Sequence, residues 1–298
     1  MSVRPGSSVR ARVEEVAVRD GMPVRRARED ALATEEPLEI RLVRVSKTVA
    51  GRVPPGAARP LAVTMRTPGA DFELAAGFLF AEGIVARRED VAAVSYCTGG
   101  EQRYNVVNVV LADSVDFDLD APPRPFLSTS ACGVCGKASI EAALGMACES
   151  IESDVVVDAE TLLALPARLR EAQAVFERTG GLHAAALFTA AGELLRVRED
   201  VGRHNALDKL VGASLLAGEL PLGVHVVLVS GRLSFELAQK AARAGVAVLA
   251  GVSAPSSLAV DTARSVGMTL VGFLRESRFN VYAGGERIAA GRGTLSGG

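Results

Sequence analysis

The stretch Val224-His225-Val226-Val227-Leu228-Val229 has the composition of a strand buried in a sheet, being short, apolar and rich in β-branched side chains. Two further strands follow it at regular intervals, each after a helical pattern. The expected order is a helix over 235–244, a strand over 246–250, a helix over 257–266 and a strand over 269–273. This alternation with short links predicts an α/β sheet covered by helices on its faces.

Earlier residues predict further elements on both sides of a stiff connector. Strands over 184–188 and 193–197, joined by an Ala-Gly turn, precede a helix from about Asn205 to Ala217. Nearer the N-terminus the pattern predicts one helix over 71–82, ended by Gly83, and three strands over 38–42, 61–65 and 106–111. The connector contains Pro122, Pro123 and Pro125.

The connector divides the chain into two expected domains, a smaller N-terminal α+β domain and a larger α/β domain. We expect a tail at each end because those residues lack a clean period. The expected boundaries are a flexible tail over 1–30, the smaller domain over 31–125, the larger domain over 126–285 and a flexible C-terminal tail over 286–298.

Composition excludes several classes of function. The chain has 298 residues with a net charge of −2, so it has no electrostatic reason to bind nucleic acid or a membrane surface. It has no apolar run of membrane-spanning length and no apolar segment typical of a secretory signal. Four cysteines in a chain of this length do not make a disulfide framework. We therefore expect a cytoplasmic protein whose cysteines are reduced.

The motif Cys132-Gly133-Val134-Cys135-Gly136-Lys137 carries the most chemistry and precedes a helix-compatible run over 138–147. Such a pair of thiols serves in metal ligation, in disulfide redox or in carriage of sulfur as a persulfide. The flanking glycines indicate that Cys132 and Cys135 are not inert core cysteines. Cys97 and Cys148, which are isolated in the sequence, are expected to be structural cysteines of the core. The motif alone leaves these three chemistries open.

Metal ligation and disulfide redox fit the surrounding sequence poorly. Structural zinc requires a second pair of ligands, but the remaining cysteines are isolated and the histidines are scattered at positions 183, 204 and 225. A zinc deaminase has an H-x-E element before its cysteine pair, and no histidine precedes Cys132. A thioredoxin-like pair follows a strand, whereas loop-forming residues precede Cys132. We expect no metal held by protein ligands.

Sulfur carriage fits best on chemical grounds. A persulfide carrier needs an accessible thiol of low pKa on a mobile segment. A helix N-terminus and Lys137 both favour the thiolate, and the glycines supply mobility. The neighbouring thiol could release the carried sulfur by forming a disulfide.

A second polar region suggests an anion-binding site. The segment over 198–209 leads into the helix, and its side chains Arg203, His204 and Lys209 could bind a phosphate near the helix start. A solvated, salt-bridged helix explains the segment equally well. The loops Ser230-Gly231-Arg232 and Ser253-Ala254-Pro255 each follow a strand, at the sheet edge where α/β proteins bind ligands. Arg232 could pair with a phosphate there, which favours a nucleotide-bearing ligand.

These motifs together resemble the FdhD/NarQ family of formate dehydrogenase accessory sulfurtransferases. The cysteine motif and the 198–209 segment are the most specific matches. Further matches are Glu36-Pro37-Leu38, Thr67-Pro68 with Gly77-Phe78-Leu79, Thr179-Gly180-Gly181-Leu182-His183, the loops at 230–232 and 253–255, and the segment over 273–278.

The resemblance implies a cytoplasmic, homodimeric sulfur carrier. Its members take sulfur from a cysteine desulfurase and pass it to the molybdenum cofactor, bis-molybdopterin guanine dinucleotide, before the cofactor enters formate dehydrogenase. It implies that Cys132 carries the persulfide and that Cys135 assists. The implied cofactor contacts are Phe273, Leu274, Arg275, Glu276, Ser277 and Arg278. The larger domain is expected to resemble the cytidine deaminase fold without its zinc site.

Two alternatives remain open. The first is a chaperone that holds the cofactor without transferring sulfur, for which Cys132 is dispensable. The second is a zinc hydrolase acting on nucleobases, which predicts stoichiometric zinc. Which desulfurase and which dehydrogenase serve as partners lies beyond the sequence.

Overall fold

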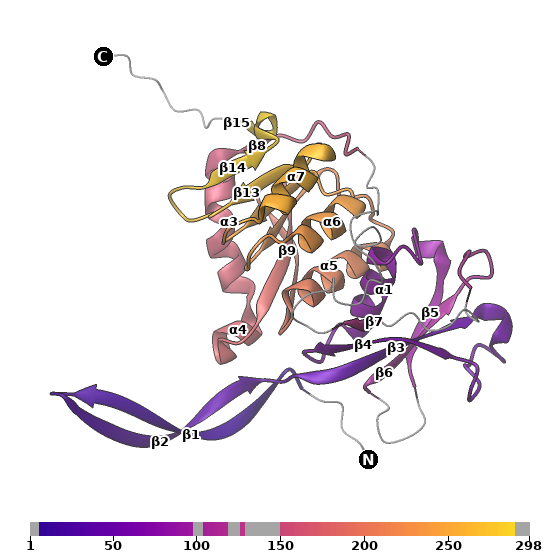
Figure 1. Ribbon diagram of the computed structural model, residues 1–298, viewed down its shortest axis with the longest axis horizontal. Coiled ribbons are helices and arrows are strands. Elements are labelled where there is room, and N and C mark those ends of the chain that lie inside the picture. The colour runs from indigo at the N-terminus through magenta and orange to yellow at the C-terminus, as the bar shows by residue number, and fades with distance from the viewer. Residues whose placement is uncertain (1–5, 98–103, 119–125, 129–149, 290–298) are drawn as a thin grey trace.

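A computed structural model describes residues 6–97, 104–118, 126–128 and 150–289 (Figure 1). Within these ranges the chain forms a six-stranded sheet, a five-stranded sheet, a two-stranded hairpin and one short pair of strands. The mixture of helices and sheets confirms the expected α/β class.

The six-stranded sheet has the order β10-β9-β11-β12-β13-β14. Its central strands are parallel, and the outer strands are antiparallel to their neighbours. The strands are β9 (His183–Thr189), β10 (Leu194–Asp200), β11 (His225–Val229), β12 (Val248–Gly251), β13 (Thr269–Gly272) and β14 (Asn280–Ala283). The apolar run at 224–229 is thus a central strand, as expected from its composition.

Helices cover both faces of this sheet. Figure 1 shows α3 on one side and α5, α6 and α7 on the other. These helices are α3 (Ala159–Ala172), α5 (Arg203–Ala217), α6 (Phe235–Arg243) and α7 (Ser257–Ser265), with the short α4 (Ala174–Thr179) after α3. The sequence pattern missed α3 and α4, although Leu162, Leu165 and Leu169 lie on one buried face of α3 at helical spacing. Pro166 within α3 weakened that signal.

The five-stranded sheet has the order β5-β6-β3-β4-β7 and carries α1 (Asp71–Ala81). Its strands are β3 (Glu36–Arg44), β4 (Arg59–Arg66), β5 (Val91–Tyr96), β6 (Val106–Leu111) and β7 (Phe126–Ser128), with two 3-10 turns at Val45–Lys47 and Arg88–Asp90. Because β7 pairs with β4, residues 126–128 belong to the smaller sheet. The expected domain boundary at 125/126 is therefore too early.

Both expected tails contain regular structure. Residues 8–33 form a hairpin of β1 (Ser8–Arg19) and β2 (Met22–Ala33), which corrects the prediction of a flexible tail over 1–30. At the other end, a 3-10 turn at Gly285–Arg287 leads into β15 (Ile288–Ala289), which pairs with β8 (Val157–Asp158). Residues 286–289 of the expected tail thus contain regular structure.

Helices α1 and α5 join the two sheets through a contact that admits only glycine. A Cβ atom on Gly77 would lie 1.9 Å from the backbone oxygen of Asp208, and one on Gly212 would lie 1.9 Å from that of Glu73. The two helix backbones therefore approach each other directly. An ion pair between Arg198 of β10 and Glu73 of α1 lies beside this contact.

Candidate functional site

The predicted sulfur-carrying residues Cys132 and Cys135 lie outside the described residues, as do Lys137 and Cys148. Their roles therefore remain predictions. Cys97 is described; it follows β5, is partly buried and donates its backbone N–H to the carbonyl of Val106. This position at the end of a strand agrees with a structural cysteine.

The loops at the carboxyl ends of the central strands form one hydrogen-bonded layer. The backbone N–H of Leu233, after β11, donates to the carbonyl of Ala254, after β12, over 3.1 Å. The N–H of Phe273, after β13, donates to Ser253 over 3.1 Å. The loops predicted from the sequence to share one sheet edge are therefore in contact.

A groove of about 490 Å³ opens beside this layer, between α3, α4 and the ends of β11 and β12. It is lined by Pro166, Leu169, Arg170, Gln173, Phe176, Gly180, Gly181, Leu182, His183, Ser230 and Val252. Arg170 stacks on the ring of Phe176, with its guanidinium carbon 4.6 Å from the ring centre. Burial lowers the pKa of His183, so its imidazole is neutral near pH 7. The groove therefore combines apolar walls with a few hydrogen-bonding groups, as ligand sites do.

Gln173 is the most informative polar residue of the groove, and sequence reasoning missed it. Gln173 is 5% exposed and lines the groove together with Phe176. Its side-chain amide carries both a donor and an acceptor, so it can bond a ligand that offers the complementary pair. A lone glutamine has no sequence pattern that could have revealed it.

The segment over 273–278 connects β13 and β14 and adjoins the groove. Phe273 is 40% exposed with a left-handed φ of 52°, whereas Leu274 is fully buried. Arg275 donates a side-chain bond to the carbonyl of Val252, a groove residue, and its backbone N–H bonds Arg278 over 2.9 Å. Arg275, Glu276, Ser277 and Arg278 are exposed and available to a ligand, but Leu274 belongs to the core.

The weaker candidates separate into two groups. Arg232 is exposed in the loop after β11. Arg203, the first residue of α5, lies close to that loop, because a Cβ on Gly231 would be 3.9 Å from the Cβ of Arg203. The same Cβ would be 3.4 Å from Nδ1 of His183. These residues meet at the predicted sheet edge. Lys209 does not reach it.

Lys209 is 2% exposed and lies between the two domains. Its ammonium forms an ion pair with Asp200 at 2.7 Å and donates to the carbonyls of Thr67 at 2.8 Å and Glu199 at 3.2 Å. Three acceptors use all three donors of the ammonium. The prediction that Lys209 contacts a phosphate is therefore wrong, because its ammonium is buried and already bonded to three protein acceptors.

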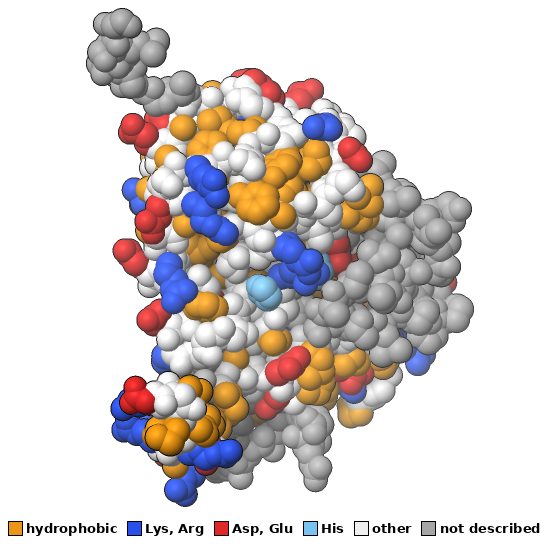
Figure 2. Space-filling model, turned by 60° about the vertical axis from the view of Figure 1, so that its left-hand side comes forward, with side chains coloured by type: hydrophobic (Ala, Val, Ile, Leu, Met, Phe, Trp, Pro, Cys, Tyr) orange, Lys and Arg blue, Asp and Glu red, His pale blue; other side chains and the backbone are white. Residues whose placement is uncertain are grey.

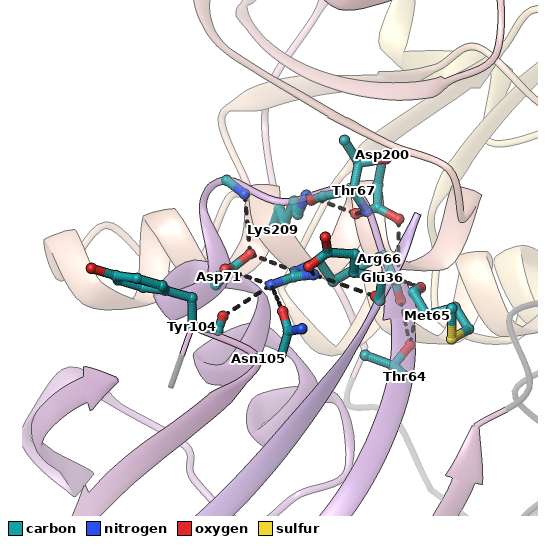
Figure 3. Close-up of polar contacts among 12 residues, drawn as sticks. Glu36, Thr64, Met65, Arg66, Thr67, Asp71, Tyr104, Asn105, Asp200 and Lys209 are labelled. Atoms are coloured by element: carbon teal, nitrogen blue, oxygen red, sulfur yellow. Dashed lines mark hydrogen bonds and ion pairs between the residues drawn. The ribbon is translucent and has the colours of Figure 1, made fainter. Parts of the chain in front are cut away.

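The same region forms a polar joint between the domains, shown in Figure 3. Asp200 also accepts from the backbone of Thr67 at 3.1 Å, and Asn205 donates to the carbonyl of Met65 at 2.7 Å. Arg66, which is fully buried, binds both carboxylate oxygens of Asp71 at 3.1 and 3.2 Å. The polar density of 198–209 thus serves this joint as well as the sheet edge.

His204 faces α6 and not open solvent. Its Nε2 lies 3.1 Å from a carboxylate oxygen of Glu236 and 3.3 Å from the hydroxyl of Ser234. Burial lowers its pKa to about 4 despite the nearby carboxylate, so the ring is neutral at pH 7. One turn further, Asp208 and Lys240 form a buried ion pair at 2.5 Å, and burial raises the pKa of Asp208 to about 6.

No group of three or more His, Cys, Asp or Glu side chains in the described ranges is arranged to hold a metal ion. Among the helices of the described ranges, none has the length and apolarity needed to cross a membrane.

Comparison with known proteins identifies the relatives of this chain. The model of the FdhD/NarQ family matches residues 35–289. The chain belongs to the FdhD/NarQ family. It is 53% identical over 287 residues to the "Sulfur carrier protein FdhD" of Streptomyces coelicolor, covering 94% of this chain and 96% of that protein. The same-named protein of Mycobacterium tuberculosis is 53% identical and covers 88% of this chain and 92% of its own length.

A solved structure supports the fold. The crystal structure of a formate dehydrogenase accessory protein from Desulfotalea psychrophila superposes with a TM-score of 0.71 at 24% identity, covering 94% of this chain and 99% of that chain. At this identity the likeness concerns the fold alone. The two proteins therefore share one fold over almost their whole lengths.

Proposed function

We propose that this chain accepts sulfur as a persulfide on Cys132 from a cysteine desulfurase and transfers it to the molybdenum cofactor, bis-molybdopterin guanine dinucleotide, before the cofactor enters formate dehydrogenase. The observation that carries the proposal is the similarity along almost the whole chain to proteins named sulfur carriers. The Cys132-x-x-Cys135 motif supplies the thiols that this chemistry needs.

The first step is a balanced exchange between two cysteines. The Cys132 thiolate attacks the terminal sulfur of the donor's persulfide, the donor's sulfur–sulfur bond breaks, and the donor cysteine leaves as a thiolate. Cys132 then carries the terminal sulfur as a persulfide. No external oxidant is needed.

The second step uses Cys135. Its thiolate attacks the inner sulfur of the Cys132 persulfide, a disulfide forms between the two cysteines, and hydrosulfide leaves for the cofactor. The carried sulfur is reduced while the two thiols are oxidised, so a thiol reductant must regenerate the pair. This assigns the assisting role to Cys135.

The groove and the loops beside it are the proposed cofactor site. Arg275, Arg278 and Arg232 are exposed near one edge of the sheet and suit the pyrophosphates of the cofactor. The amide of Gln173, which lines the groove, suits the adjacent N–H and C=O of a guanine. The protein is proposed to work as a cytoplasmic homodimer.

Intact-mass measurement tests the sulfur transfer. The chain is incubated with cysteine and a cysteine desulfurase, and a gain of about one sulfur atom, 32 Da, is expected. Cys132→Ala is expected to abolish the gain, whereas Cys97→Ala is the control that retains it. An unmodified wild-type chain, or full loading of Cys132→Ala, contradicts the proposal.

A chaperone that holds the cofactor without sulfur transfer is the competing function. For that function, Cys132→Ala retains both cofactor binding and formate dehydrogenase maturation. If the chain is a sulfur carrier, Cys132→Ala abolishes formate dehydrogenase maturation but retains cofactor binding. Complementation of a deletion strain with single cysteine variants separates the two.

A further inference from the structure

The hairpin of residues 8–33, called the arm below, extends away from both sheets (Figure 1). Asp20 and Gly21, with φ angles of 51° and 76°, form the two-residue turn at its tip, the φ signature of a type I′ turn. At its base Ala33 lies near Gly181, so a Cβ on that glycine would be 3.4 Å from the Cβ of Ala33. The arm thus begins beside the groove and points outward.

The arm is an unusual structure for a chain in water. A two-stranded sheet is marginally stable unless a third strand or a helix covers it. In the described part of the chain, β1 and β2 pair only with each other, which leaves a free edge on each strand. Of the 15 exposed large hydrophobic side chains in the described ranges, six belong to the arm: Val9, Val16, Val18, Met22, Val24 and Leu32. Figure 2 shows apolar and basic side chains gathered on the arm at the lower left.

The charges of the arm favour a copy of itself as the partner. The arm holds six arginines and five acidic residues, so a strongly charged partner such as nucleic acid is not favoured. Along β1 the arginines Arg10 and Arg12 come first and the acids Glu14 and Glu15 follow. Glu14 already pairs with Arg25 of its own arm at 2.7 Å. An antiparallel copy of β1 centred on Val13 would bring Arg12 of the second copy opposite the same carboxylate.

We propose that the arm pairs with the arm of a second copy of this chain, β1 against β1, to form a four-stranded antiparallel sheet. With Val13 on the two-fold axis, Arg12 lies opposite Glu14 of the second copy. Val9 then lies opposite Ala17 of the second copy. Within each hairpin Val9 pairs with Leu32 and Ala17 pairs with Val24, so the row across the four strands is Leu32, Val9, Ala17 and Val24. This register aligns four apolar residues on one face of the sheet, three of which are exposed in the single chain.

The proposal rests on the homodimer proposed above and names the surface that forms it. A two-fold contact uses the same edge twice, so one self-complementary strand suffices. The pairing also supplies the additional strands that an isolated hairpin lacks. Exposed ion pairs contribute little by themselves, so the backbone bonds and the apolar rows carry the association.

Proline substitutions on the two edges of the arm form a matched test. Arg19 and Met22 flank the two-residue turn, so they form a hydrogen-bonded pair and every second residue from them also bonds within the hairpin. The residues between direct their N–H groups outward, and these include Val16 in β1 and Ala27 in β2. Proline at an outward position leaves the hairpin intact but blocks edge pairing. Sedimentation velocity of the full chain is expected to give a dimer whose dissociation constant rises about tenfold or more in Val16→Pro and is unchanged in Ala27→Pro.

Cysteine cross-linking provides a second measurement. Val13→Cys is expected to give a covalent dimer under mild oxidation above the wild-type background, because the two Val13 residues face each other across the axis. Val24→Cys, on the other strand, is expected to stay at background.

Each outcome decides the proposal. If the wild-type chain is a dimer and neither Val16→Pro nor deletion of residues 7–33 changes its dissociation constant, the arm contact is overturned but the proposed homodimer stands. A dimer weakened only by Ala27→Pro overturns the β1 pairing. A monomeric wild-type chain overturns both, while persulfide loading of Cys132 is measured separately and stands independently.

Discussion

The ammonium of Lys209 lies 2.7 Å from the carboxylate of Asp200, and both side chains are almost completely removed from solvent. Asp200 ends β10 and Lys209 lies in α5, and each of the two groups also forms a hydrogen bond with Thr67 of the smaller domain. The pair therefore couples the orientation of the two domains to the start of α5. From there Arg203 reaches the loop that borders the groove.

Replacing Lys209 by methionine is expected to lower the free energy of unfolding by about 3–5 kcal/mol, because Asp200 would remain buried without its counter-charge. Chemical denaturation of the full chain measures this. Arg232→Ala is the control, since Arg232 is exposed and its loss is expected to change stability by less than about 0.5 kcal/mol. If Lys209→Met were as stable as wild type but bound the cofactor weakly, Lys209 would be a ligand after all.

Replacing Gly77 by alanine is expected to destabilise the protein by about 1–3 kcal/mol, although alanine is the better helix former. The added Cβ would lie 1.9 Å from the backbone of Asp208, so α1 and α5 must move apart. Gly223→Ala is the matched control, because its Cβ would lie 3.7 Å from the nearest atom. Thermal unfolding of both variants checks the prediction, and equal melting temperatures would contradict the close helix contact.

The stability of the protein is expected to fall as the pH drops from about 6.5 towards 4, in part through His204. The pKa of His204 is lowered from 6.5 to about 4 in the folded protein, so the unfolded chain binds the proton first and the folded state is disfavoured in this window. The shift corresponds to about 3 kcal/mol. The charged groups that affect its pKa are Glu236, Lys240 and Arg203, together with His183.

Comparison of wild type with His204→Gln isolates this contribution. The variant is expected to show a shallower loss of unfolding free energy between pH 6.5 and 4. Identical slopes would show that His204 titrates normally in the folded protein.

Replacing Gln173 by leucine is expected to change the free energy of unfolding by about 1 kcal/mol or less, because the side chain keeps a similar volume at the wall of the groove. If the groove binds guanine, the same variant loses about tenfold or more in affinity for guanosine diphosphate. Isothermal titration calorimetry measures this, with adenosine diphosphate as the control nucleotide. Unchanged affinity for the guanine nucleotide would remove Gln173 from the site.

Several elements could be predicted because local composition was enough. The strand at 224–229 and the helices that follow it are confirmed, since continuous apolar runs and helical spacing report burial directly. The arm was missed because both of its faces are exposed, so its charges and valines show no alternation of burial. The Asp20-Gly21 turn was the signal that could have revealed it.

The candidate site was only partly predictable. The convergence of the loops after β11, β12 and β13 follows from parallel strands and was expected. The inward direction of Lys209 was not, because a segment dense in polar residues has the same appearance whether it binds a ligand or joins two domains. Gln173 lies between α3 and α4, and Phe176 lies in α4; no local pattern specifies how these helices pack against the sheet.

The sequence by itself determined the alternation of strands and helices from β11 to β13, the thiol pair at 132 and 135, and the family, because these depend on the identity and spacing of neighbouring residues. Only the tertiary structure decided which polar residues face the groove and which join the domains. That choice depends on contacts between residues more than a hundred positions apart, such as Lys209 with Thr67, and burial there determines whether a charge is available to a ligand or already paired.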